Sequence, residues 1–125
     1  MRARGLAAIT VAQGVLILGT WGAFVARGVF GQGIRTVENN QYLAFHVAAE
    51  VAMGLALLVG GAGLALRHGW GTAVAVAAWG AVVYSAVNAL AHAARKEQRL
   101  TPVLAGSAAL GVAMVGLLGR KRNGR

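Results

Sequence analysis

The 125-residue chain contains no cysteine, one proline and only three acidic side chains. The lack of cysteine excludes disulfides, thiolate metal ligands and a cysteine nucleophile. The shortage of carboxylates excludes an ordinary soluble domain, because a soluble chain of this size needs far more polar surface. The composition is instead apolar, with 58% hydrophobic residues and 19 glycines. The composition therefore favours a protein that is embedded in a lipid bilayer.

Four long apolar segments are present, at about residues 5–26, 42–66, 71–94 and 100–119. Each has about the 20 residues that a helix needs to cross roughly 30 Å of hydrocarbon. Runs such as LALLVGGAGLAL lack the alternation of a membrane β-barrel, and only helices or closed barrels satisfy the backbone in lipid. The sequence predicts an all-α protein, a four-transmembrane-helix bundle in a single domain over residues 1–125.

The first segment also begins like a secretory signal peptide, with MRAR before an apolar stretch. Its apolar run is longer than a typical signal core, and Phe24 stands three residues before a cut at Ala26, where a small residue is required. We therefore expect the first segment to be a span.

The net charge of +9 comes from twelve Lys and Arg residues that lie almost entirely at span ends. They form no stripe with aromatic residues between them, so we expect a lipid bilayer and no nucleic acid as partner. With the N-terminus inside, the cytoplasmic side holds seven and the other side holds five. The positive-inside rule therefore predicts a multi-pass cell-membrane protein with both termini cytoplasmic, and the small bias also permits insertion in both directions. The cytoplasmic set is Arg2, Arg4, Arg67, Arg120, Lys121, Arg122 and Arg125; the other set is Arg27, Arg35, Arg95, Lys96 and Arg99.

A histidine and a carboxylate interrupt the second apolar segment, in the motif FHVAAE at residues 45–50. His46 and Glu50 are four residues apart, so they share one helix face. The link RHGWG after this segment is so short that the second and third spans must be antiparallel neighbours. Residues at equal depth on these two helices then have numbers that sum to about 136, since both helices rise about 1.5 Å per residue.

This relation places His46 level with about residue 90 and Glu50 level with about residue 86. The third span reads YSAVNALAH at that depth, and its polar residues at spacings of three and four share a face. The same arithmetic places Thr20 and Trp21 near the level of Glu50, and Ser107 near that of Asn88. We therefore predict one buried ligand or proton site formed by His46, Glu50, Tyr84, Ser85, Asn88 and His92.

Three chemistries could use such a site. A proton could pass between Glu50 and a histidine, since both side chains can hold and release one. A metal could bind to His46, Glu50 and His92, although no HExxH-type motif is present, and a b-type haem could bind between the two histidines. The small residues Ala77, Ala81, Ser85 and Ala89 predict close packing of the second and third spans, which disfavours a haem. We predict no cofactor, and the metal question stays open.

The motifs FHVAAE, GGAGL, WG and YSAVN resemble small four-span bacterial and archaeal membrane proteins of uncharacterised function, over about residues 42–118. That resemblance implies a membrane fold and no activity. The stretch YLAFHVAAEV is similar to the first span of small multidrug resistance transporters, which implies that Glu50 is a shared proton and drug site. In this chain the glutamate lies on the second span, and two spans follow it where that family has three.

These observations predict a small membrane protein with a buried polar site that binds or translocates a small ligand, an ion or a proton. We expect a homo-oligomer or a membrane partner protein, because four spans enclose little volume. The alternative is a non-catalytic accessory or assembly subunit, in which the polar cluster only fixes helix packing. We expect no enzyme, because no nucleophile, redox residue or convincing metal set is present.

Overall fold

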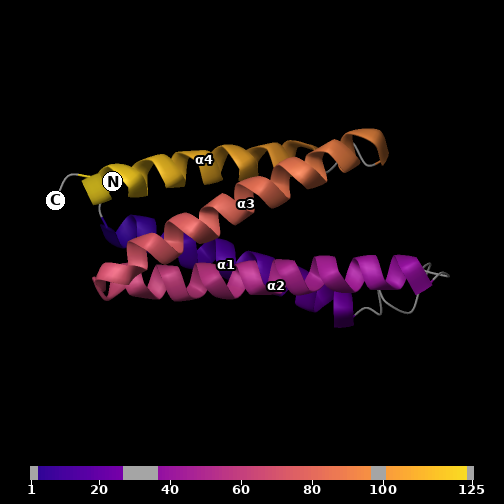
Figure 1. Ribbon diagram of the computed structural model, residues 1–125, viewed down its shortest axis with the longest axis horizontal. Helices are drawn as coiled ribbons and strands as arrows, with labels where there is room; N and C mark the ends of the chain where they lie inside the picture. The colour runs from indigo at the N-terminus through magenta and orange to yellow at the C-terminus, as the bar shows by residue number, and fades with distance from the viewer. Residues whose placement is uncertain (1–2, 27–36, 97–100, 124–125) are drawn as a thin grey trace.

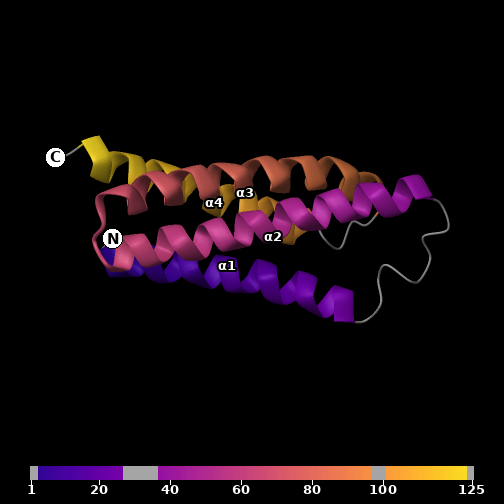
Figure 2. The same cartoon turned by 60° about the horizontal axis from the view of Figure 1, so that its bottom comes forward.

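The computed structural model of the protein describes residues 3–26, 37–96 and 101–123, without the side chains of 24–25, 37–44, 92–96 and 121–123. These residues form four helices: α1 (Ala3–Ala26), α2 (Val37–Ala65), α3 (Gly69–Lys96) and α4 (Thr101–Asn123). The helices run side by side along one long direction, and the turn between α2 and α3 lies at the same end as the start of α1 and the end of α4 (Figures 1 and 2). The predicted all-α, four-helix fold is confirmed.

Each helix contains a segment long and apolar enough to cross a membrane: Ala3–Ala23, Phe45–Ala65, Gly69–Ala91 and Thr101–Arg120. The shortest has 20 residues, which at about 1.5 Å per residue spans about 30 Å, the thickness of the hydrocarbon core. Within the described ranges the backbone forms no strand. The chain is therefore a multi-pass membrane protein, with four helices in the part that the structure describes.

Helices that follow one another in sequence make the extensive contacts: α1 with α2, α2 with α3, and α3 with α4. Glycine allows the closest approaches. A Cβ atom on Gly60 would lie 2.8 Å from the backbone nitrogen of Ala75, so α2 and α3 meet backbone to backbone there. A Cβ atom on Gly14 would lie 2.9 Å from the carbonyl oxygen of Gly54, which gives α1 and α2 a similar contact.

A left-handed residue ends α2 and turns the chain into α3. The N–H of His68 donates to the carbonyl of Gly63 at 2.9 Å, and the N–H of Arg67 donates to the carbonyl of Leu64 at 3.2 Å. This is the pattern of a Schellman cap, in which glycine is usual at the left-handed position. Here Arg67 occupies that position, with φ of 59°. The cap explains why three residues, Leu66 to His68, suffice to connect the two helices.

The core lies at one end of the bundle. We call residues 3–14, 53–82 and 111–123 the hairpin half, and residues 15–26, 37–52, 83–96 and 101–110 the Glu50 half. Every side chain or glycine that the structure describes as buried lies in the hairpin half, except Ala86. The largest fully buried side chains are Trp79, Leu57, Met114, Leu118 and Thr10. The two halves of this bundle therefore differ in packing, although their sequences are about equally apolar.

A buried hydrogen bond joins α3 to α1 within the hairpin half. The indole N–H of Trp79 donates to the hydroxyl oxygen of Thr10 at 3.0 Å, and the Thr10 hydroxyl donates to the carbonyl of Leu6 at 2.7 Å. Both side chains are completely buried. The polar atoms of this pair are thus satisfied inside the protein, as burial in an apolar core requires.

The predicted packing stripe on α3 is wrong in part. Ala77 and Ala81 are exposed, and the close contacts with α2 come from Gly71 and Ala75. The reason is physical: small residues at helical spacing show that a face can pack closely, but they do not say which neighbour it packs against.

Candidate functional site

The side chain of Glu50, on α2, accepts one hydrogen bond from α1 and one from α3. The indole N–H of Trp21, on α1, donates to Oε2 of Glu50 at 3.4 Å. The hydroxyl of Ser85, on α3, donates to Oε1. Each carboxylate oxygen therefore has one donor, one from α1 and one from α3.

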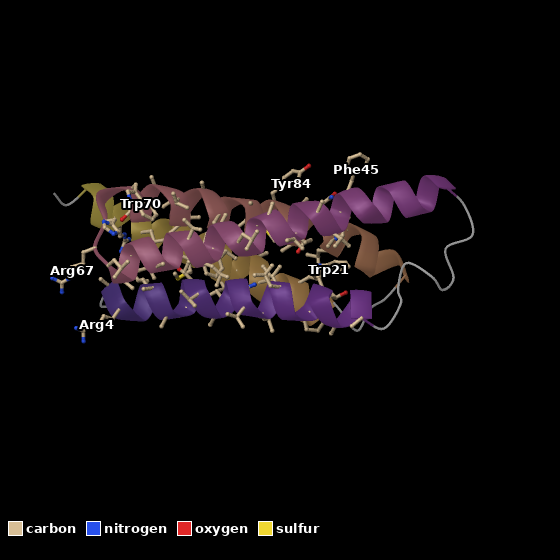
Figure 3. The ribbon with its side chains drawn as sticks, turned by 90° about the horizontal axis from the view of Figure 1, so that it is seen from below. Arg4, Trp21, Phe45, Arg67, Trp70 and Tyr84 are labelled. Atoms are coloured by element: carbon tan, nitrogen blue, oxygen red, sulfur yellow. The ribbon has the colours of Figure 1, made fainter. Side chains whose placement is uncertain are left out.

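His46 joins the same group through Trp21. The imidazole and indole rings meet edge to face, with centroids 5.4 Å apart and planes at 75°. His46 stands one helical turn before Glu50 on α2, so both side chains reach toward α1. Figure 3 shows Trp21 between α1 and α2. We call Trp21, His46, Glu50 and Ser85 the Glu50 cluster.

Helix geometry explains why these residues meet. The depth relation across the short turn places Glu50 level with about residue 86, and the contact is made by Ser85. Trp21 lies within the apolar segment Ala3–Ala23 of α1. The Glu50 cluster therefore lies within the membrane-spanning segments, and it lies in the half of the bilayer away from the α2–α3 turn.

The Glu50 cluster is only half buried. All four of its side chains are intermediate in exposure, whereas Thr10 and Trp79 are completely buried. Glu50 lies within the apolar segment Phe45–Ala65 of α2. A charged carboxylate within an apolar membrane-spanning segment is costly.

Two of the predicted site residues lie elsewhere. Tyr84 is 76% exposed and Asn88 is also exposed. Both line a shallow groove on the outer face of α3, together with Gly80, Val83 and Val87. Tyr84 points away from α1 in Figure 3. The structure thus brings together His46, Glu50 and Ser85 from the predicted set, and it separates Tyr84 and Asn88 from them.

The side chain of His92 lies outside the described residues, so its predicted place in the site stays a prediction. Among the side chains that the structure describes, no three of the types His, Cys, Asp and Glu come together as a metal site. The proposed set of His46, Glu50 and His92 is not tested by that result, because it includes His92.

Trp21 belongs to the Glu50 cluster, but it was not among the predicted site residues. The depth arithmetic did place Trp21 near Glu50, and its indole N–H is a donor that a carboxylate can use. Thr20, placed at the same depth, is exposed and donates to the carbonyl of Leu16 in its own helix. The choice between these two neighbours depends on the rotation of α1, which residue spacing alone did not give.

Comparison with known proteins identifies a family. Residues 1–119 match the family described as Domain of unknown function (DUF8058), which covers nearly the whole chain. The chain belongs to this family. A search of curated proteins and a search of solved structures each gave no match. Function must therefore be argued from the Glu50 cluster itself.

Proposed function

We propose that the protein binds a proton or a small monovalent cation at Glu50, inside the membrane. One observation carries the proposal: both hydrogen bonds to the Glu50 carboxylate come from uncharged groups, the Trp21 indole and the Ser85 hydroxyl. Such donors support an ionised carboxylate, which accepts hydrogen bonds and donates none. They do not cancel its charge. A negative charge in an apolar surrounding attracts a proton or a cation, because leaving it uncompensated is costly.

Trp21 and His46 support the choice of this ligand class. The indole N–H of Trp21 bonds to Oε2, so it stabilises the carboxylate in the charged form that attracts a cation. Imidazole can donate and accept a proton, and His46 touches the ring that bonds to Glu50. The likeness of YLAFHVAAEV to the first span of small multidrug resistance transporters, where a glutamate is a shared proton and drug site, supports the same role for Glu50.

The charge distribution supports an orientation for the site. Both termini in the cytoplasm would put seven basic residues inside and five outside. In that orientation the α2–α3 turn is cytoplasmic and the Glu50 cluster faces the outer leaflet. The ligand would then enter from outside the cell.

A second candidate function is an accessory or assembly subunit. The observation that favours it is that Glu50 accepts bonds from α1 and α3 at once, and so ties three helices together. A protonated glutamate could do this without any exchange of ligand. The two functions differ in whether the carboxyl group changes its charge.

Tryptophan fluorescence tests the proposal, because Trp21 touches both His46 and Glu50. Trp70 also contacts a histidine, since its ring is stacked on that of His68 with centroids 5.4 Å apart. We would therefore use a His68→Gln background to remove that signal. Titration with protons over about pH 4 to 9, which covers carboxyl and imidazole groups, should change the emission, and so should Na⁺ or K⁺ if a cation binds.

Two variants decide the outcome. Trp21→Phe should lose the response because the reporter is gone, and Glu50→Gln should lose the cation response and the carboxyl part of the proton response. An identical titration in Glu50→Gln would favour the accessory role. Translocation would be tested separately, by proton or cation flux into liposomes that contain the wild type or Glu50→Gln.

A further inference from the structure

We propose that the end of the bundle with the α2–α3 turn binds the phosphate headgroup of an anionic phospholipid. The binding groups are Arg4 at the start of α1, Arg67 in the turn and Arg120 near the end of α4, and we call these three residues the arginine end. All three side chains are exposed. This surface is separate from the Glu50 cluster, so the inference does not depend on the proposed function.

Arg4 and Arg67 come to about the same depth from neighbouring helices. A Cβ atom on Gly61 would lie 3.3 Å from the carbonyl oxygen of Ala7, so these two residues mark one level of α1 and α2. The two helices are antiparallel (Figure 2), so three residues back along α1 match three residues onward along α2. Arg4 is therefore level with about Leu64, one turn from Arg67. Figure 3 shows the side chains of Arg4 and Arg67 projecting from the same end of the bundle.

Arg120 reaches a similar level on α4. A Cβ atom on Gly111 would lie 3.5 Å from the carbonyl oxygen of Trp79, which marks one level of α3 and α4. Arg120 follows Gly111 by nine residues, and Trp70 precedes Trp79 by nine. Since α3 and α4 are also antiparallel (Figure 1), Arg120 is level with about Trp70. Three separate stretches of the chain thus bring an arginine to one end of the bundle.

The arginine end lies where the spans begin or end. The apolar segments have their boundaries on this side at Ala3, Ala65, Gly69 and Arg120. This is the level at which hydrocarbon gives way to lipid headgroups. The phosphate oxygens of phospholipids are at that level, and a guanidinium group can bind phosphate through two parallel N–H bonds.

The hairpin half supplies no carboxylate side chain to pair with these arginines. The three acidic residues of the chain are Glu38, Glu50 and Glu97, and none of them belongs to this half. At the other end of the spans the sequence places Glu97 directly after Lys96, and Glu38 three residues after Arg35. The positive charge of the arginine end is therefore not balanced by an acidic side chain of its own half, and an anionic partner from outside the chain complements it.

The backbone of Arg67 gives a second, independent reason. Its φ of 59° is left-handed, a conformation that costs energy for an L-residue and that glycine adopts freely. The cap itself is made by backbone groups, through the bonds from His68 to Gly63 and from Arg67 to Leu64. Glycine would serve this turn better, so the turn does not explain an arginine here. Binding of a phosphate group does explain it.

Trp70 favours a phospholipid over a free phosphate ion. Its side chain is 49% exposed in the first turn of α3. Its ring is stacked on that of His68, with centroids 5.4 Å apart and planes at 10°. A tryptophan at the end of a span is typical of the headgroup level of a bilayer. A free phosphate ion needs charge alone, whereas a phospholipid also needs an apolar surface beside the charge.

Quenching of Trp70 by brominated lipid tests the inference, because bromine quenches tryptophan emission on contact. The full-length protein in phosphatidylcholine vesicles is titrated with brominated phosphatidylglycerol or brominated phosphatidylcholine, and the ratio of the two effects gives the relative binding constant of the anionic lipid. We expect a ratio of about five or more, since each basic residue near an anionic surface contributes about that factor. Trp70→Phe should remove the excess. An equal effect of both lipids, or an excess that Trp70→Phe keeps, would overturn the inference.

Single charge variants identify the binding group. Arg67→Gln should lower the ratio by about threefold to fivefold. The matched control is Arg95→Gln, which removes one basic residue at the other end of the spans and should leave the ratio unchanged. No change with Arg67→Gln, or an equal fall in both variants, would overturn the inference.

Inorganic phosphate distinguishes the two sources of the same chemical group. Compared with sodium chloride at equal ionic strength, which screens charges to the same extent, it should leave the ratio unchanged. A fall specific to inorganic phosphate would overturn the assignment of a lipid.

Arg67→Gly separates a role in binding from a role in the turn. Glycine is the usual residue at this left-handed position, so the midpoint of thermal unfolding in detergent should stay unchanged or rise. The lipid ratio should fall as in Arg67→Gln. A retained ratio would overturn the inference, and so would a lower midpoint, because the arginine would then serve the turn itself.

Discussion

Two tryptophan side chains join α1 to another helix, and they do so in different surroundings. In the hairpin half, Trp79 donates to Thr10, and both side chains are completely buried. In the Glu50 half, Trp21 donates to Glu50, and both are half buried. The first acceptor is a hydroxyl, which has no charge to gain or lose, whereas the second is a carboxyl group, which does.

The side chains around the Trp79–Thr10 bond are also more closely packed than those around the Trp21–Glu50 bond. Close glycine contacts such as Gly60 against Ala75 hold the hairpin half together, while the described part of the Glu50 half has one buried residue, Ala86. A completely buried hydrogen bond between uncharged groups suits a fixed contact between two helices. A half-buried carboxyl group with neutral donors suits an exchangeable ligand. The comparison therefore agrees with our proposal that the hairpin half stabilises the fold and the Glu50 half binds the ligand.

The largest expected difference between the two halves is in the stability lost when each tryptophan is replaced by alanine. Trp79→Ala should lower the free energy of unfolding by about 3–5 kcal/mol, the range for large buried aromatic side chains. Trp21→Ala should lower it by well under half of that, because the side chain is only half buried. Thermal or denaturant unfolding in detergent measures both, and similar losses would contradict the division of roles.

Replacing a glycine by alanine in each half should give a smaller difference in stability. Gly60→Ala should destabilise the fold by about 1–3 kcal/mol, because the new Cβ would lie 2.8 Å from the backbone of α3, which cannot move aside cheaply. Gly19→Ala is the matched control in the Glu50 half, where no atom lies within 4 Å of the new Cβ. It should be neutral or stabilise the helix by up to about 1 kcal/mol. Equal effects would show that the two halves are equally well packed.

The fold followed from the sequence because the lengths of the apolar runs set the spans. The short link RHGWG set the pairing of α2 with α3, and the depth relation placed Glu50 level with residue 86, next to Ser85, which makes the contact. Depth is fixed by counting residues, since every helix rises by the same amount per residue. Residue counting also places Trp21 near the level of Glu50, and its indole N–H donates to that carboxylate.

The rotation of each helix was harder to predict. In water an apolar stripe marks the buried face, but in lipid both faces of a span are apolar. The expectation that Ala77 and Ala81 pack against α2 was wrong for this reason, and Tyr84 and Asn88 face outward although they share the depth of the Glu50 cluster. The Thr10–Trp79 bond was also not anticipated, because no charge or motif marks it.

Single hydrogen bonds give the smallest expected effects. Thr10→Val keeps the shape of the side chain but leaves the Trp79 N–H buried without its acceptor, so we expect a loss of about 1 kcal/mol. Ser85→Ala removes one donor from a half-buried carboxyl group and should cost about half of that or less. Ser85→Ala should nevertheless shift the proton or cation titration, whereas Thr10→Val should leave it unchanged. The opposite pattern of titration effects would reverse the roles of the two halves.

The most direct measurement of the central claim is the infrared absorption of the Glu50 carboxyl group during a pH titration of the protein in lipid. The chain has only three acidic residues, so replacement of Glu38 and Glu97 by glutamine leaves Glu50 as the sole side-chain carboxyl. The protonated-acid band should then appear and disappear reversibly with pH, and added Na⁺ or K⁺ should weaken it if a cation competes with the proton. Glu50→Gln should abolish the band, whereas Thr10→Val should leave it unchanged. A Glu50 band that stays constant over about pH 4 to 9, the range over which exchangeable carboxyl groups titrate, would contradict the account and leave Glu50 as a fixed packing residue.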